Sequence, residues 1–196
     1  MTYKDKSFSK EELKGKDFLG EIFVNCRFLG ADLKFSSFKN CQFKTCDFSG
    51  VIFDLTGFSN CSFPESKLSN LDFSSVLFKD CNFSHSLAVN CVFQQFKNGN
   101  KNERKKYDLT GCSFENSQLE RTVFVFCDLK RVCFTKANLI GTVFEKCDLK
   151  ETDFSAADIS GMGVENSKIE KTILDLTGFI QFGNSKGFVL KEQGLT

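Results

Sequence analysis

The side chains that could do chemistry in this 196-residue chain are ten cysteines, a single histidine (His85) and carboxylates scattered among basic residues. Thiols and imidazoles are common zinc ligands, but a structural zinc site needs four converging ligands, usually from paired CxxC or Cys/His motifs. The chain contains no CxxC, and it has no Gly-rich phosphate loop, HExxH motif or nucleophile constellation. We therefore expect no metal site, no cofactor and no enzymatic activity.

The elements that must position these side chains are set by a five-residue period. Large apolar residues recur at every fifth position from Phe8 to Phe93 and, one residue out of phase, from Leu109 to Phe179. We call these 33 positions the beat. Of them, 32 carry a large apolar side chain, and 20 of the 25 phenylalanines lie on the beat. Because helices repeat near 3.6 and strands at 2, the period predicts a solenoid that turns a corner every five residues.

A second inward position lies two residues before each beat and carries small side chains. Nine cysteines occupy it, and they are Cys26, Cys41, Cys46, Cys61, Cys81, Cys91, Cys112, Cys127 and Cys147. Here cysteine acts as a small, well-buried side chain, and stacked cysteines with parallel Cβ vectors disfavour disulfides. Only Cys133, one residue before the beat, should point outward as a candidate reactive thiol. His85 also falls at an outward position.

The number of faces follows from the beat residues between Leu109 and Phe154, which alternate leucine and phenylalanine. With four faces, each one five-residue unit long, leucine lies over leucine and phenylalanine over phenylalanine in successive coils. Such columns pack without steps in a dense interior. We therefore expect each coil to consist of four five-residue units.

Several five-residue units resemble those of the pentapeptide-repeat family, whose units read A(D/N)Lxx. The match is carried by Ala31-Asp32-Leu33, Ala137-Asn138-Leu139 and Ala157-Asp158-Ile159, with Cys46-Asp47-Phe48 as a variant. The resemblance covers about residues 21–174. It implies an all-β fold, a right-handed quadrilateral (four-sided) β-helix solenoid.

Departures from the repeat divide the single solenoid domain, residues 1–196, into segments. The first small inward positions carry Lys6, Glu11, Lys16 and Glu21, and charges cannot be buried there unpaired, so we expect a looser cap. The segments are an N-terminal cap (1–20), a first block of coils (21–93), an inserted basic loop (94–108), a second block of coils (109–174) and a C-terminal helix and tail (175–196).

The inserted loop has no inward pattern. The beat at Leu109 comes 16 positions after that at Phe93, where the normal step is 5, so the insertion accounts for the other 11. Its basic residues are Lys97, Lys101, Arg104, Lys105 and Lys106, which with Glu103 give a local net charge of +4. A tolerated surface insertion and a partner-binding loop are both consistent with this composition, since binding residues often lie on loops of a rigid scaffold. Direct nucleic-acid binding is disfavoured because the loop lacks interleaved aromatic residues.

The C-terminal segment predicts a short α-helix at an open end of the solenoid. Leu176, Phe179 and Ile180 follow helical spacing, Gly183-Asn184 supplies a stop signal, and residues 188–190 could add an edge strand. The segment resembles the tail of the Qnr and MfpA branch of the family, where the helix joins two subunits tail to tail. That resemblance implies a homodimer; the alternative is a capping helix in a monomer. The expected interface is Leu176, Phe179, Ile180, Phe182, Phe188, Val189 and Leu190.

Two surface features of the second block are candidate contact sites. Asp108, Asp128 and Asp148 should lie one above another on a leucine face, although aspartate also favours turns for local reasons. On a neighbouring face Val123, Val125, Phe126 and Val143 project outward as an apolar patch. Exposed contiguous apolar surface often marks a contact site.

Two functions remain in competition. Resemblance to the Qnr and MfpA branch implies a DNA mimic that binds DNA gyrase or topoisomerase IV and protects it from quinolones. Duplex DNA carries one charge per about 1.7 Å, whereas the whole chain has a net charge of +1. This near neutrality favours the alternative, a structural or adaptor rod that binds another protein. The sequence shows no transmembrane run and no signal peptide, so we expect a cytoplasmic protein without membrane contact.

Overall fold

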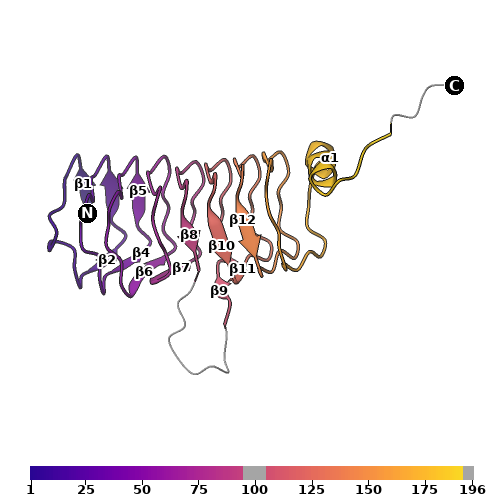
Figure 1. Ribbon diagram of the computed structural model, residues 1–196. Helices are drawn as coiled ribbons and strands as arrows, with labels where there is room; N and C mark the ends of the chain where they lie inside the picture. The colour runs from indigo at the N-terminus through magenta and orange to yellow at the C-terminus, as the bar shows by residue number, and fades with distance from the viewer. Residues whose placement is uncertain (95–104, 192–196) are drawn as a thin grey trace.

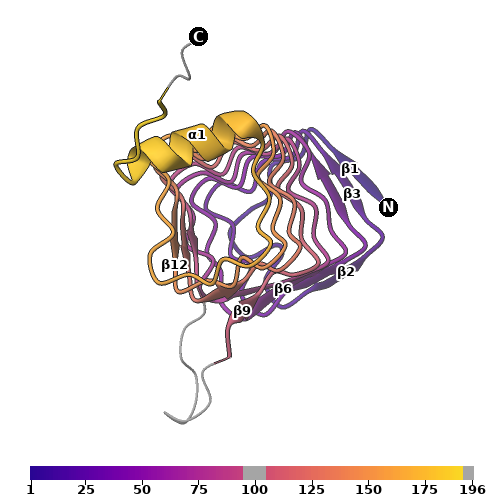
Figure 2. The same ribbon diagram turned by 90° about the vertical axis from the view of Figure 1, so that its right-hand side faces the viewer.

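The computed structural model describes residues 1–94 and 105–191, and it shows a four-sided β-solenoid of about seven turns (Figures 1 and 2). Paired residues in neighbouring coils are 20 positions apart, as in Tyr3↔Phe23 and Phe38↔Phe58. All pairings between named strands are parallel. The predicted four-sided β-helix, with four units in each coil, is therefore confirmed.

The four faces are numbered in chain order. Face 1 carries β1 (Thr2–Lys4), β3 (Ile22–Val24) and β5 (Gln42–Lys44). Face 2 is joined, in the described part of the chain, by isolated bridges such as Ser7↔Arg27. Face 3 carries β8 (Val92–Phe93), β10 (Val123–Val125) and β12 (Val143–Glu145). Face 4 carries β2 (Asp17–Leu19), β4 (Ser37–Lys39), β6 (Thr56–Ser59) and β7 (Val76–Lys79), followed by β9 (Tyr107–Asp108) and β11 (Cys127–Asp128) (Figure 2).

The beat residues fill the interior as columns of stacked rings. Phe28 and Phe48 have ring centroids 4.6 Å apart with planes 9° from parallel, and Phe114 and Phe134 are 5.0 Å apart at 5°. Rings within one coil meet edge to face, which is favourable for aromatic quadrupoles. Most beat residues are buried. The exceptions are the half-buried Phe18, Phe53, Val164 and Leu174 and the exposed Ile169 and Phe179.

The small inward position does more than leave room, because it supplies hydrogen-bond donors. All nine cysteines predicted there are buried. Eight of them donate to the carbonyl of an inward-facing residue in the preceding coil, as Cys61 does to Phe38 at 3.4 Å. Serine and threonine do the same, for example Thr142 to the Leu119 carbonyl at 2.8 Å. Burial raises the pKa of the Cys91 thiol to about 11, so it stays protonated and can donate at neutral pH.

Residues 1–20, where the sequence predicted a looser cap, form a coil that pairs with the next one on faces 1, 2 and 4, but residues 9–14 on face 3 make no β-bridge to it. β1 pairs in register with β3, and β2 pairs with β4. The charges at the inward positions are tolerated because they lie at the open end and find partners. Lys6 pairs with Glu12 and lies 4.7 Å above the Phe8 ring centroid, and the α-ammonium of Met1 is 2.7 Å from Glu21.

The two blocks of coils join at a seam where the insertion enters. Across it, paired residues are 31 positions apart, as in Val92↔Val123, which is 11 more than the 20 found elsewhere. Tyr107 fills the inward position of the resumed coil, fully buried, and its hydroxyl donates to the Val76 carbonyl at 2.7 Å. At Gly111 a Cβ would lie 2.1 Å from a carboxylate oxygen of Asp80 and 3.2 Å from its Cα, so a larger residue here would require the Asp80 side chain to move.

A short helix, α1 (Leu176–Ser185), lies across the C-terminal end of the solenoid (Figures 1 and 2). Asp175 caps it by accepting from the Gly178 N–H at 2.7 Å, and its other oxygen accepts from Ala156 in the preceding coil at 2.8 Å. The helix ends at Ser185, one residue beyond the stop signal predicted at residues 183–184, and Gly187 follows with φ +84°. The predicted strand at residues 188–190 is also absent. No helix in the described residues is long and apolar enough to cross a membrane.

Candidate protein-binding surfaces

The three predicted acidic residues do form a column on face 4. Asp108 and Asp128 are partners in the β9–β11 pair, and Asp128 bridges to Asp148. Each carboxylate accepts the backbone N–H two residues on, with distances of 3.0, 3.3 and 3.2 Å. The same turn recurs at Asp47 and Asp72 in the first block. Local turn chemistry thus accounts for aspartate at these positions.

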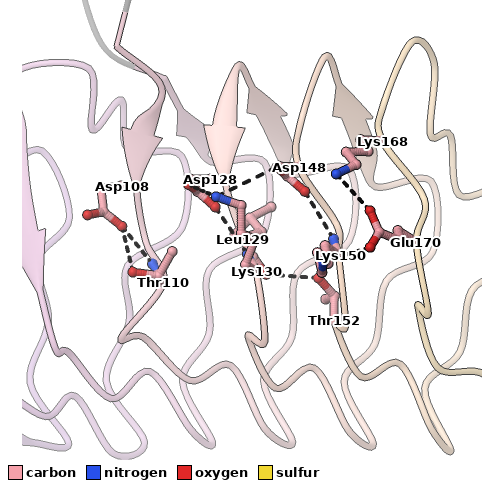
Figure 3. A network of polar contacts seen from close by, with 10 residues as sticks. All are labelled: Asp108, Thr110, Asp128, Leu129, Lys130, Asp148, Lys150, Thr152, Lys168 and Glu170. Carbon is pink, nitrogen blue, oxygen red and sulfur yellow. Dashed lines mark hydrogen bonds and ion pairs between the residues drawn. The ribbon is translucent and has the colours of Figure 1, made fainter.

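A basic side chain pairs with two of the three carboxylates of this column, whereas Asp108 accepts from Thr110 (Figure 3). The Lys130 ammonium lies 2.8 Å from Asp128 and 3.7 Å from Asp148. Further along, Glu170 accepts from Lys150 at 2.6 Å and from Lys168 at 2.7 Å. These two hydrogen bonds hold the pKa of Glu170 at about 2, and the bond to Asp128 raises the pKa of Lys130. We call this set the charge ladder: residues 108, 128, 130, 148, 150, 168 and 170.

The predicted apolar patch lies on face 3 and at its corner with face 4, but it is half-buried. Val123 pairs with both Val92 and Val143 across β8, β10 and β12. Val123, Val125, Phe126 and Val143 are all of intermediate exposure, so the sequence overestimated how far they project. The close parallel strands shield them, because neighbouring side chains on one face of a sheet cover one another.

Of the predicted loop 94–108, the structure describes residue 94 and residues 105–108. Lys97, Lys101 and Arg104 lie outside the described residues. Lys105 is exposed, and the ammonium of Lys106 lies 5.9 Å from the ring centroid of Phe126, within cation–π range. The solenoid resumes at Tyr107 and Asp108 in β9, before the predicted end of the loop.

Two exposed apolar residues of the first block were missed by sequence reasoning. Phe35 is 57% exposed and Leu55 is 61% exposed, and both lie at the corner between faces 3 and 4. Each stands two residues after a beat, where the backbone is left-handed and other coils carry mainly glycine, asparagine or charged residues. An off-beat large apolar residue at this position is the signal that could have found them.

At the C-terminal end, apolar side chains remain uncovered. Leu176 and Phe179 are exposed, whereas Ile180 and Phe182 are half-buried, and Phe182 packs against the core. The predicted interface residues Phe188, Val189 and Leu190 are also exposed. A cavity of about 280 Å³ between α1 and the last coil is lined by Phe154, Met162, Phe179, Phe182 and six further residues. The structure therefore brings α1 to the open end of the rod, as predicted, but leaves part of that end apolar and accessible.

A four-sided parallel solenoid with one large inward residue in five defines a pentapeptide-repeat architecture. The family model for pentapeptide repeats matches eight copies, over residues 22–53, 57–95, 108–139 and 133–162, and the chain belongs to this family. No curated protein matches the chain.

Solved structures similar to this chain include those of QnrB1, a plasmid-mediated fluoroquinolone resistance protein. A trypsin-treated point variant of QnrB1 aligns with a TM-score of 0.62 and 18% identity, covering 97% of this chain and 99% of that chain. Full-length QnrB1 aligns with a TM-score of 0.53 and 16% identity, covering 95% and 97%. At such identities the likeness establishes the fold alone.

Proposed function

We propose that this chain is a non-enzymatic protein-binding rod whose partner is a type II topoisomerase such as DNA gyrase, which it protects from fluoroquinolones. The observation that carries the proposal is the overlap with QnrB1 over nearly the whole of both chains. A partner that recognises the shape of such a rod needs its length and its four-sided cross-section. This chain has the same fold as QnrB1 over 97% of its length. What differs between the chains is the surface, so the mode of contact has to be argued from this molecule.

Binding by imitation of DNA charge is not supported by the geometry. A DNA mimic needs a run of unpaired negative charge, and duplex DNA carries one per about 1.7 Å. On face 4 the carboxylates of Asp128, Asp148 and Glu170 are instead paired with Lys130, Lys150 and Lys168. Positive and negative charges therefore alternate on face 4, which favours recognition through shape and local contacts.

The deciding experiment is a gyrase supercoiling assay with ciprofloxacin. Rescue of supercoiling by micromolar protein supports the topoisomerase partner, and a chain lacking residues 97–106 shows whether the insertion takes part. If the protein neither rescues supercoiling nor binds gyrase, the topoisomerase is ruled out as its partner. An adaptor rod with another protein partner then remains.

Charge mimicry can be tested separately with Asp108→Asn, Asp128→Asn and Asp148→Asn combined. Asparagine keeps the acceptor that closes the turn, as Asn82 does for the Ser84 N–H at 2.8 Å. The triple variant should therefore fold normally while it loses three negative charges. We expect undiminished protection of gyrase. A marked loss of protection would support the hypothesis that the acidic column imitates DNA charge.

We also propose a homodimer joined through the C-terminal end. The support is the exposed Leu176 and Phe179, together with the apolar cavity beneath α1, because such surface is commonly buried in an interface. Light scattering should show a dimer for the full chain and a monomer for a chain ending at Leu174. An unchanged subunit number after truncation would contradict the tail-to-tail arrangement.

A further inference from the structure

We draw no further inference here: the strongest candidate, the exposed apolar patch that Phe35 and Leu55 form at the corner between faces 3 and 4, carries nothing because nothing in the structure shows what covers it.

Discussion

The two blocks of coils on either side of the insertion share one interior but use face 4 in opposite ways. In both, beat residues stack at the same period, with ring centroids 4.6 Å apart for Phe28 and Phe48 and 5.0 Å for Phe114 and Phe134. On face 4 of the first block, Lys39 and Lys79 make no ion pair with any described residue, and Leu77 is exposed. In the second block, Lys130, Lys150 and Lys168 are all paired with carboxylates.

This contrast separates what the repeat requires from what it leaves free. A solenoid is stabilised by contacts between neighbouring coils, so the inward positions are constrained in the same way along its whole length. The outward positions are constrained only by the turn that each corner makes. On face 4 the second block pairs Lys130, Lys150 and Lys168 with carboxylates, whereas the first block leaves Lys39 and Lys79 without an ion pair to a described residue and Leu77 exposed.

The largest expected effect tests the shared interior. Phe48→Lys and Phe134→Lys each bury an unpaired charge within a ring column, and each should cost roughly 3–5 kcal/mol or more and prevent stable folding. Ser49→Lys, one residue outside the column, should change stability little. Circular dichroism melts and soluble yield provide the measurement. Tolerance of lysine in one block but not in the other would show that the two interiors are not equivalent.

The sequence was sufficient to predict this interior because burial follows the beat directly. The period indicates the inward positions, and the alternation of leucine and phenylalanine indicates four faces. The out-of-phase step at Leu109 indicates an insertion whose length the Val92↔Val123 register confirms. Phe18 and Phe53 are among the beat residues that depart from the rule and are only half-buried. The period alone cannot distinguish an end coil or a locally wider corner from a regular one.

The surface was less predictable, because it depends on side-chain exposure and pair geometry rather than on the period. The left-handed corners recur two residues after the beat, so the period places Phe35 and Leu55 at corners, but it does not show how far their side chains are exposed. The column of Asp108, Asp128 and Asp148 was placed correctly, but which ammonium meets which carboxylate depends on side-chain reach. The size of cysteine explains its burial at the inward positions, whereas its hydrogen-bond donation emerges only from the distance between coils.

The second prediction concerns the packing of Tyr107 at the seam between the two blocks. Tyr107 is fully buried at the seam, and Tyr107→Ala should cost about 3–5 kcal/mol through the cavity it leaves. Calorimetry should then resolve two transitions, because each block retains its own stacked coils. Tyr107→Phe keeps the ring and removes the hydroxyl that donates to the Val76 carbonyl at 2.7 Å and lies 3.4 Å from the Phe73 carbonyl, so it should cost about 1–2 kcal/mol and retain one transition. A single sharp transition for Tyr107→Ala would mean that the seam does not depend on this side chain.

The third prediction compares a hydrogen-bond donor in each block. Cys61 donates to the Phe38 carbonyl at 3.4 Å, and Cys147 donates to the Phe124 carbonyl at 3.3 Å. Alanine at either position should cost about 1–2 kcal/mol, because a donor and a little buried volume are lost. Serine, which keeps a donor, should cost less than alanine in both blocks, as judged by urea unfolding. If alanine and serine are equivalent, the thiols contribute packing alone.

The smallest effect concerns the charge ladder of the second block. Hydrogen bonds from Lys150 and Lys168 hold the pKa of Glu170 at about 2, below the ordinary value of 4.5. A carboxylate whose pKa is depressed in the folded state contributes stability above its ordinary pKa and loses it as the pH falls toward the folded value. The Glu170 side chain is 39% exposed, so screening by solvent keeps the contribution small.

Glu170→Gln should therefore be slightly less stable than the natural chain at pH 7, and the difference should vanish between about pH 4.5 and pH 2. High salt should reduce the difference at pH 7 in the same way, because exposed ion pairs are screened. Glu65→Gln removes an exposed carboxylate of the first block that makes no ion pair with a described residue, and it provides the matched control. If both variants show the same dependence on pH, the ladder does not stabilise the second block, and the paired and unpaired halves of face 4 differ only in what they offer to a partner.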